Sequence, residues 1–372
     1  MLVLLVAGAA LGGRAYGGDL SDAWLASRVK ELRTATELVG CGALVVVDGK
    51  MVAVAADGER KLGSGVAVSV NDKWHHGSIT KSMTSTVIGK LVQQKKLDWQ
   101  QTLAEMLPDQ KLKMHETWRA VTLHQLLTHT AGAPANVSIV DSLRWPTTRE
   151  EIHAARVEVV GRILAAPTAG EPGDQHSYSN VGYIIAGHVA ATTAKMPWEA
   201  LVQKELFAPM KLKSAGFGAP VDTGGKKPDQ PWGHVFALFW RTAMDPKDRA
   251  DNTPILGPAG TVHMTMQDLA TYGWEHLQGE LGKDGLLPAK LFRKLHEPAI
   301  KSYGYGWGTL EPEWAGGKMI WHNGSNNMWY SLLLLLPAKK TVMVFVTNEG
   351  SIEKADKAFT ELAEKIAGQI GD

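Results

Sequence analysis

A serine and a lysine three residues apart, Ser78 and Lys81, have the types and spacing best suited to covalent chemistry. Side chains at this spacing share one face of a helix, so the hydroxyl and the amine can meet. A serine hydroxyl alone is a poor nucleophile, but a desolvated lysine with a lowered pKa can accept its proton. The N-terminus of the same helix offers backbone N–H groups and a positive dipole end to a developing oxyanion. The pair therefore predicts a serine nucleophile with a lysine base.

The S-x-x-K pattern occurs three times, and its surroundings distinguish the three copies. Residues 27–30 lie in an amphipathic helix pattern beside other charges, which is typical of a solvated surface. Residues 351–354 are typical of a helix cap with a glutamate in the first turn. Only Ser78 follows a strand and a glycine-containing turn and opens a strongly apolar helix pattern, predicted from residue 78 to about 96.

Two further motifs bring polar groups of complementary kinds. Tyr178 and Asn180 follow a loop rich in glycine and precede an apolar helix pattern. Taken alone, they are typical of a helix-capping loop. His322, Gly324 and Ser325 end a predicted strand near the C-terminus, and taken alone they are typical of a turn.

The ordered set S-x-x-K, Y-x-N and H-x-G resembles the serine β-lactamase and penicillin-binding-protein superfamily, specifically its class C-like branch. That branch contains class C β-lactamases, family VIII carboxylesterases, and D-aminopeptidase and DD-carboxypeptidase relatives. The resemblance extends from about residue 40 to the C-terminus. It includes the stretches HHGSITKSMTSTVIGKLVQQKKLDWQQTLAEMLP, TLHQLLTHTAGAP, PGDQHSYSNVGYIIAGHVA, GPAGTVHMTMQDLATY and HNGSNNMWYS.

The resemblance implies a role for each motif residue. Ser78 would be acylated, and Lys81 would accept or relay its proton. Tyr178 would share the base role and later activate the deacylating water, while Asn180 would orient Lys81 and the substrate. The backbone N–H groups of Ser78 and Ser325 would form the oxyanion hole.

One motif residue departs from the family pattern: His322 stands where β-lactamases and transpeptidases usually have lysine. A neutral imidazole is a poor anchor for a substrate carboxylate, and one with an ordinary pKa of about 6.5 gains charge only as the pH falls towards 6. This favours esters over β-lactams. Gly324 and Ser325 complete the substrate-facing strand, and Asn136 is expected to face the cleft.

The overall composition excludes several other classes. Lysine and arginine number 39 and aspartate and glutamate 38, so the net charge of +1 gives no field for binding nucleic acid. The single cysteine, Cys41, excludes a disulfide framework. No H-E-x-x-H motif is present among the 13 histidines, and neither a metal nor a cofactor is expected. The absence of a G-x-S-x-G elbow argues against an α/β-hydrolase.

Strand patterns at both ends of the chain and helix patterns between them predict the fold class. We expect an α+β protein whose antiparallel sheet is built from both termini and flanked by helices. The sheet domain would comprise residues 19–75 and 255–372, and a mainly helical domain, residues 76–254, would be inserted into it. Asp48-Gly49 joins the first two strands as a tight hairpin turn. Residues 219–258 are expected to form a loop.

The first 18 residues have the length and apolar character of a signal peptide, although no basic residue precedes the apolar run. They are too short to span a bilayer comfortably. The expected location is therefore the periplasm or the exterior if this segment is a signal, and the cytoplasm otherwise.

These observations predict a serine hydrolase that acts through an acyl-enzyme on carboxylic esters or small amides, with carboxylesterase favoured. A β-lactamase and a D-amino-acid peptidase or DD-carboxypeptidase are the alternatives within this class. A penicillin-binding or regulatory protein that acylates without turnover is the alternative from another class. The partner is a small molecule, and the oligomeric state is not predicted.

The first prediction distinguishes the three S-x-x-K serines. Ser78→Ala abolishes covalent labelling by a fluorophosphonate, because only Ser78 has a lysine base in an apolar helix. Ser27→Ala and Ser351→Ala retain labelling and serve as controls. Intact-protein mass spectrometry measures the adduct, and an adduct that persists in Ser78→Ala contradicts the assignment.

Overall fold

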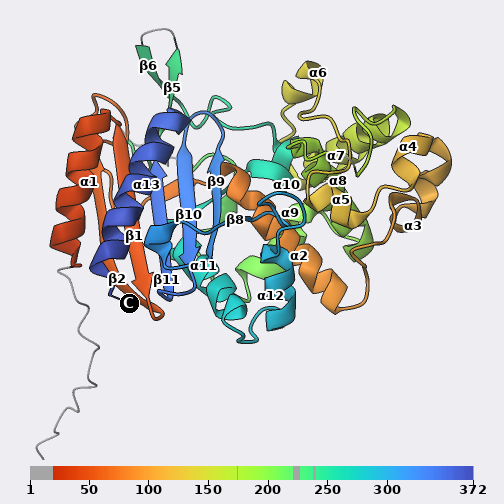
Figure 1. Cartoon of the computed structure of the whole chain (residues 1–372). Helices are drawn as coiled ribbons and strands as arrows, with labels where there is room; N and C mark the ends of the chain where they lie inside the picture. Colours follow the sequence, from red (N-terminus) through yellow and green to blue (C-terminus); the bar gives the residue numbers. More distant parts are fainter. Residues whose placement is uncertain (1–19, 174, 221–226, 238–239, 372) are drawn as a thin grey trace, which may run out of the picture.

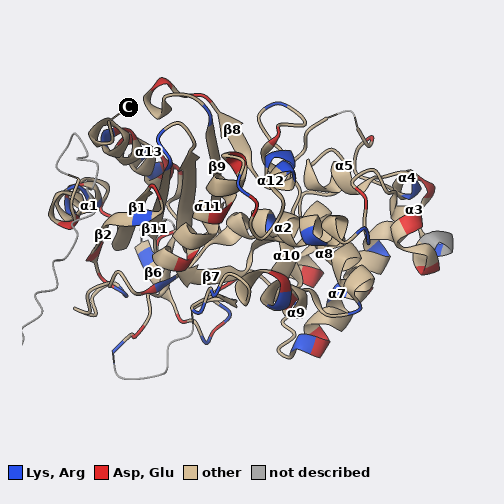
Figure 2. Cartoon of the chain, turned by 90° about the horizontal axis from the view of Figure 1, so that it is seen from below, with Lys and Arg blue, Asp and Glu red and all other residues tan. Residues whose placement is uncertain are grey.

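The computed structural model describes residues 20–173, 175–220, 227–237 and 240–371. The segment predicted as a signal peptide, residues 1–18, lies outside the described residues. Among the described helices, none is both long enough and apolar enough to cross a bilayer. Basic and acidic residues are interspersed along the chain (Figure 2), in agreement with the net charge of +1.

A six-stranded antiparallel sheet joins the two ends of the chain, which confirms the predicted fold class (Figure 1). Its strand order is β2-β1-β11-β10-β9-β8. The pairing of β1 with β11 joins strands from the two ends of the chain and places Cys41 opposite Thr347. The strands span Gly40–Val47 (β1), Lys50–Gly58 (β2), Gly308–Leu310 (β8), Met319–Ser325 (β9), Tyr330–Leu336 (β10) and Thr341–Thr347 (β11).

The first hairpin forms as the sequence predicts. Asp48 and Gly49 have φ angles of 49° and 78°, the left-handed values that a tight two-residue turn requires. Every residue of β1 is buried, because both faces of the sheet are covered. Val45 faces one hydrophobic cluster and Leu44 the other, as alternate residues of a strand must.

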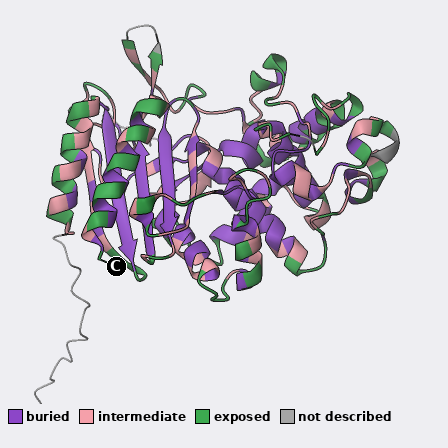
Figure 3. Cartoon of the chain, in the orientation of Figure 1, coloured by how far each residue is buried: buried purple, intermediate pink, exposed green. Residues whose placement is uncertain are grey.

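Two helices from opposite ends of the chain cover one face of the sheet, and a third covers the other (Figures 1 and 3). Helices α1 (Asp22–Thr36) and α13 (Ile352–Gln369) pack on the first face. Ser21 caps α1, accepting a hydrogen bond from the backbone of Trp24. Helix α11 (Met266–Glu280) packs against β10, β11 and β1 on the second face.

The segment expected as a loop, residues 219–258, contains regular structure. Strands β5 (Gly233–Ala237) and β6 (Trp240–Met244) form a two-stranded antiparallel ribbon that protrudes from the molecule (Figure 1). Glycine and proline around this ribbon conceal the short strands from sequence patterns. A further small sheet combines β3 (Lys73–His75), β7 (Val262–Thr265) and β4 (Gly216–Phe217) in the order β3-β7-β4.

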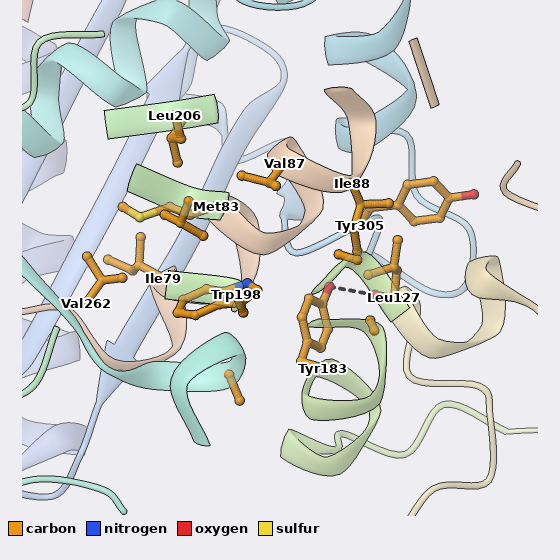
Figure 4. Packing of buried hydrophobic residues seen from close by; sticks show 14 of the residues in the cluster. Ile79, Met83, Val87, Ile88, Leu127, Tyr183, Trp198, Leu206, Val262 and Tyr305 are labelled. Carbon is orange, nitrogen blue, oxygen red and sulfur yellow. Dashed lines mark hydrogen bonds between the residues drawn. The ribbon is translucent and has the colours of Figure 1, made fainter. Parts of the chain in front are cut away.

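Helix α2 (Thr80–Gln93) is the centre of the helical region, and its residues are buried from Thr80 to Gly89. Ile79, Met83 and Val87 pack in one cluster with residues of α8 (Asn180–Ala194) and α9 (Trp198–Val202) (Figure 4). The remaining helices are α3 (Leu103–Met106), η2 (Pro108–Lys113), α4 (Glu116–Arg119), α5 (Leu123–Leu127), α6 (Ile139–Ser142), α7 (Arg149–Ala165), η3 (Gln203–Phe207), η4 (Pro254–Leu256), α10 (Gly257–Gly260), α12 (Ala289–His296) and η5 (Glu313–Ala315).

This packing generates a stability prediction. Met83→Ala removes a side chain that is 0% exposed, and we expect a loss of about 2–5 kcal/mol in the free energy of unfolding, measured by denaturant titration. Leu310→Ala, at a residue that is 46% exposed on β8, is the matched control and changes stability little. Equal losses in the two variants contradict this account of the core.

Candidate active site

Ser78 lies in a single 3₁₀ turn, η1 (Gly77–Ile79), which runs directly into α2. The side chain of Ser78 is partly exposed, whereas Lys81, one turn later, is 0% exposed. Lys81 Nζ lies 2.9 Å from Ser78 Oγ. The predicted meeting of hydroxyl and amine on one helix face is present in the structure, and the hydroxyl is open to an incoming molecule.

Three oxygen acceptors surround the amine of Lys81. Besides Ser78 Oγ, they are Asn180 Oδ1 and the backbone carbonyl of Ala259, each at 2.7 Å from Nζ. No carboxylate of the described residues lies within ion-pair distance of Lys81. Desolvation by burial lowers the pKa of Lys81 well below its ordinary value. Burial thus favours the neutral amine, the form that accepts a proton from Ser78.

Asn180 is held in one orientation from both ends of its amide. Its Oδ1 accepts from Lys81, and its Nδ2 donates to Asn136 Oδ1 at 2.7 Å. Its backbone N–H donates to the carbonyl of Ala135. Asn136 is exposed beside the site, and its side chain orients Asn180.

Tyr178 stands directly over the amine, with Lys81 Nζ 4.8 Å from the centre of its ring. The residue is 41% exposed, yet its hydroxyl end adjoins Ser78. Desolvation raises the pKa of Tyr178 to about 12, although the hydrogen bond with Ser78 opposes this shift. Tyr178 is therefore a protonated phenol at neutral pH, suited to donating and relaying a proton.

The loop that carries Tyr178 is positioned by His129. His129 Nδ1 accepts a hydrogen bond from the backbone N–H of Ser179 at 3.1 Å. Its ring lies 4.4 Å from the ring of Tyr178, centre to centre. The backbone of His129 adopts a left-handed φ of 61°, which fixes the turn.

The two predicted oxyanion-hole segments meet through a pair of glycines. A Cβ atom on Gly77 would lie 2.3 Å from Ser325 N, and a Cβ atom on Gly324 would lie 2.5 Å from Ser78 N. Such distances exclude any side chain, so glycine at both positions allows the backbones to touch. Strand β8 pairs with β9 only as far as Trp321. Beyond Trp321, this edge of β9 is not paired with β8 and faces η1.

The side chain of Ser325 is already engaged in the turn that follows β9. Its Oγ donates to the carbonyl of Trp329 at 2.6 Å and accepts from the backbone N–H of Asn327 at 2.8 Å. Only the backbone of Ser325 is therefore available to the substrate, in keeping with the predicted role of its N–H group.

His322 lies in the site, but the structure contradicts the expectation that it gains charge near pH 6. The residue is only 4% exposed. Desolvation lowers the pKa of His322 to about 3, against a hydrogen bond to the carbonyl of Asn323 that raises it. The other ring nitrogen, Nε2, lies 3.1 Å from the Tyr303 hydroxyl. His322 is thus neutral, with both nitrogens occupied.

The sequence did not identify two groups of this site. Ala259 contributes only a backbone carbonyl, for which no side-chain pattern exists. Tyr303 falls in the stretch YGYGW, which matches none of the three motifs.

A family model described as "Beta-lactamase" matches residues 25–366, and the chain belongs to this family. It is 26% identical over 367 residues to "Penicillin-binding protein 4" of Amycolatopsis lactamdurans. The matched region covers 92% of this chain and 88% of that protein.

Two solved structures share the fold. One is the D-amino acid amidase of Ochrobactrum anthropi SV3, with a TM-score of 0.73, 18% identity, and coverage of 93% of this chain and 97% of that one. The other is a beta-lactamase/D-alanine carboxypeptidase from Pseudomonas syringae, with a TM-score of 0.72, 16% identity, and coverage of 94% and 99%.

The close approach of Gly77 and Gly324 generates the third prediction. Gly324→Ala forces β9 away from η1 and lowers the turnover number on any acyl substrate by ~10²-fold or more, the order expected when an oxyanion donor is lost. Gly368→Ala, in α13 with nothing within 4 Å of the new Cβ, is the control. Full activity in Gly324→Ala contradicts the assigned oxyanion hole.

Proposed function

We propose that this protein is a serine hydrolase that forms an acyl-enzyme at Ser78 and prefers carboxylic esters, with small amides as slower substrates. The observation that carries the proposal is the buried Lys81 amine, 2.9 Å from Ser78 Oγ and without an acidic partner among the described residues. A neutral amine at this position is a base for one neighbouring hydroxyl.

Acylation follows from the arrangement of these groups. Ser78 Oγ attacks the carbonyl carbon as its proton passes to Lys81 Nζ. The carbonyl oxygen, now negatively charged, lies between the N–H groups of Ser78 and Ser325. The bond to the leaving group then breaks, and the leaving oxygen takes a proton relayed from Lys81 through Tyr178, which is protonated at neutral pH.

Deacylation uses the same groups in reverse. Water loses a proton towards Lys81 and attacks the acyl carbon, and the ester bond to Ser78 Oγ breaks as this oxygen regains a proton. Asn180, fixed by Asn136, keeps Lys81 directed at the reacting atoms during both steps.

The preference for esters rests on His322. β-Lactam substrates commonly carry a carboxylate that needs a fixed cation, and the neutral His322 is a poor one. An ester needs only the nucleophile, the base and the oxyanion hole.

Hydrolysis of D-amino-acid amides is the second candidate function. It is favoured by the structural similarity to the Ochrobactrum amidase over 93% of the chain. A protein that acylates without turnover is the third, and it is favoured by the similarity to a penicillin-binding protein.

The fourth prediction compares substrates and pH. A short-chain aryl ester is hydrolysed with a kcat/KM well above that of a chromogenic cephalosporin or a D-amino-acid amide, measured side by side. For the cephalosporin, KM stays flat from pH 8 to pH 6, because a group with a pKa of about 3 binds no proton in this range. A KM that falls as the pH approaches 6 contradicts a neutral His322.

The time course distinguishes turnover from simple acylation. Steady release of product from the ester over many equivalents supports the hydrolase. A burst of one equivalent followed by a plateau supports the acylating, non-hydrolytic alternative. Ser78→Ala is the control in both measurements.

A further inference from the structure

The two sides of the proposed oxyanion hole are the segments around Ser78 and Ser325, which lie almost 250 residues apart in the sequence. The buried carboxylate of Asp251 lies between residues that contact each segment. In the segment of Ser78, the backbone N–H of Gly77 donates to His75 Nδ1 at 3.1 Å. His75 Nε2 in turn lies 2.8 Å from Asp251 Oδ1. The ring N–H does not point straight at this oxygen, so the contact is chiefly electrostatic.

The segment of Ser325 contacts the same carboxylate oxygen, Asp251 Oδ1. Asn326, the residue after Ser325, donates from Nδ2 to Asp251 Oδ1 at 3.0 Å. The other end of this amide is fixed, since Asn326 Oδ1 accepts from the backbone N–H groups of Met328 and Trp329. Asp251 thereby connects the residue before Ser78 to the residue after Ser325.

His75 and Asp251 have the composition of a catalytic histidine–aspartate pair, but the geometry excludes that role. Nδ1 of His75 accepts from Gly77, so the ring proton sits on Nε2, the nitrogen that lies beside Asp251. Neither nitrogen is left to accept the proton of Ser78, whose hydroxyl is already paired with Lys81.

The burial of Asp251 is costly, which argues against a purely stabilising role. Its side chain is only 4% exposed, and within the described part of the chain its second oxygen, Oδ2, is buried without a hydrogen-bond partner. A buried, partly unsatisfied carboxylate weakens a fold unless something else is gained.

We propose that Asp251 is a positioning residue for the reaction, which holds the Ser78 and Ser325 N–H groups at one separation through His75 and Asn326. The proposal rests on the proposed function, because it assigns these N–H groups to the oxyanion. Asp251 touches no substrate; it acts by keeping two backbone segments in register as negative charge develops between them.

The test uses Asp251→Asn in the full-length protein. We expect kcat on an aryl ester to fall on the order of 10–100-fold, with KM within about two-fold and a melting temperature that is unchanged or higher. The decisive readout is the ratio of kcat/KM for the ester to that for its thiono analogue, which has sulfur in place of the carbonyl oxygen. Sulfur fits an oxyanion hole poorly, so a loosened hole discriminates less, and the ratio falls.

Two further variants keep the test decisive. Asn326→Ala removes the second link, together with the two hydrogen bonds that Asn326 Oδ1 accepts, and leaves the link through His75 in place. It should lower the oxygen-to-sulfur ratio in the same direction without adding fully to Asp251→Asn. Asp248→Asn removes an equal charge from an exposed residue three positions away and should change neither rate nor ratio. A lower kcat with an unchanged ratio in both Asp251→Asn and Asn326→Ala overturns the proposal.

Failure of this inference is distinguishable from failure of the proposed function. If the wild-type protein is acylated but does not turn over, the proposed hydrolase is wrong. The same ratio is then measured on the acylation rates of the two esters, and it still decides whether Asp251 sets the oxyanion hole.

Discussion

The burial of one amine determines how this site is built. Lys81 is excluded from water and has no carboxylate partner in the described chain, so its charged form is disfavoured and its position must be fixed by neutral acceptors. Those acceptors come from three places: η1, the start of α8, and α10. The packing of α2 against its neighbours therefore supports the proposed chemistry as well as stability, since water admitted beside α2 would favour the charged form of Lys81.

The same low-dielectric surroundings govern the other titratable groups. Burial lowers the pKa of His322 and of His129 and raises that of Tyr178. All three are neutral at pH 7, and in the site they serve as hydrogen-bonding or packing groups. A site of this kind favours substrates whose charge appears only in the transition state, because a ligand that arrives charged loses its hydration without finding a counter-ion.

Local features of this protein could be predicted from sequence, and features that depend on distant segments could not. The Asp48-Gly49 hairpin, the Ser21 cap and the Ser78–Lys81 meeting each involve residues close in the chain, where turn and helix geometry decide the outcome. The β5–β6 ribbon lies among glycines and prolines, which favour a loop on local grounds. The Ala259 carbonyl has no side-chain signal, and the neutrality of His322 depends on its burial beside Tyr303, which only the folded chain brings about.

The central strand pairing has a consequence for biosynthesis. Strand β1 leaves the ribosome some 300 residues before its partner β11, as the pairing of Cys41 with Thr347 requires. Until β11 has been synthesised, the β1–β2 hairpin has one apolar edge unpaired. This state is prone to aggregation and to binding by chaperones. Ser325 is likewise synthesised almost 250 residues after Ser78, so a nascent chain that has already formed α2 still lacks half of the proposed oxyanion hole. The proposed reaction with acyl compounds therefore requires that β9 has been synthesised as well as α2.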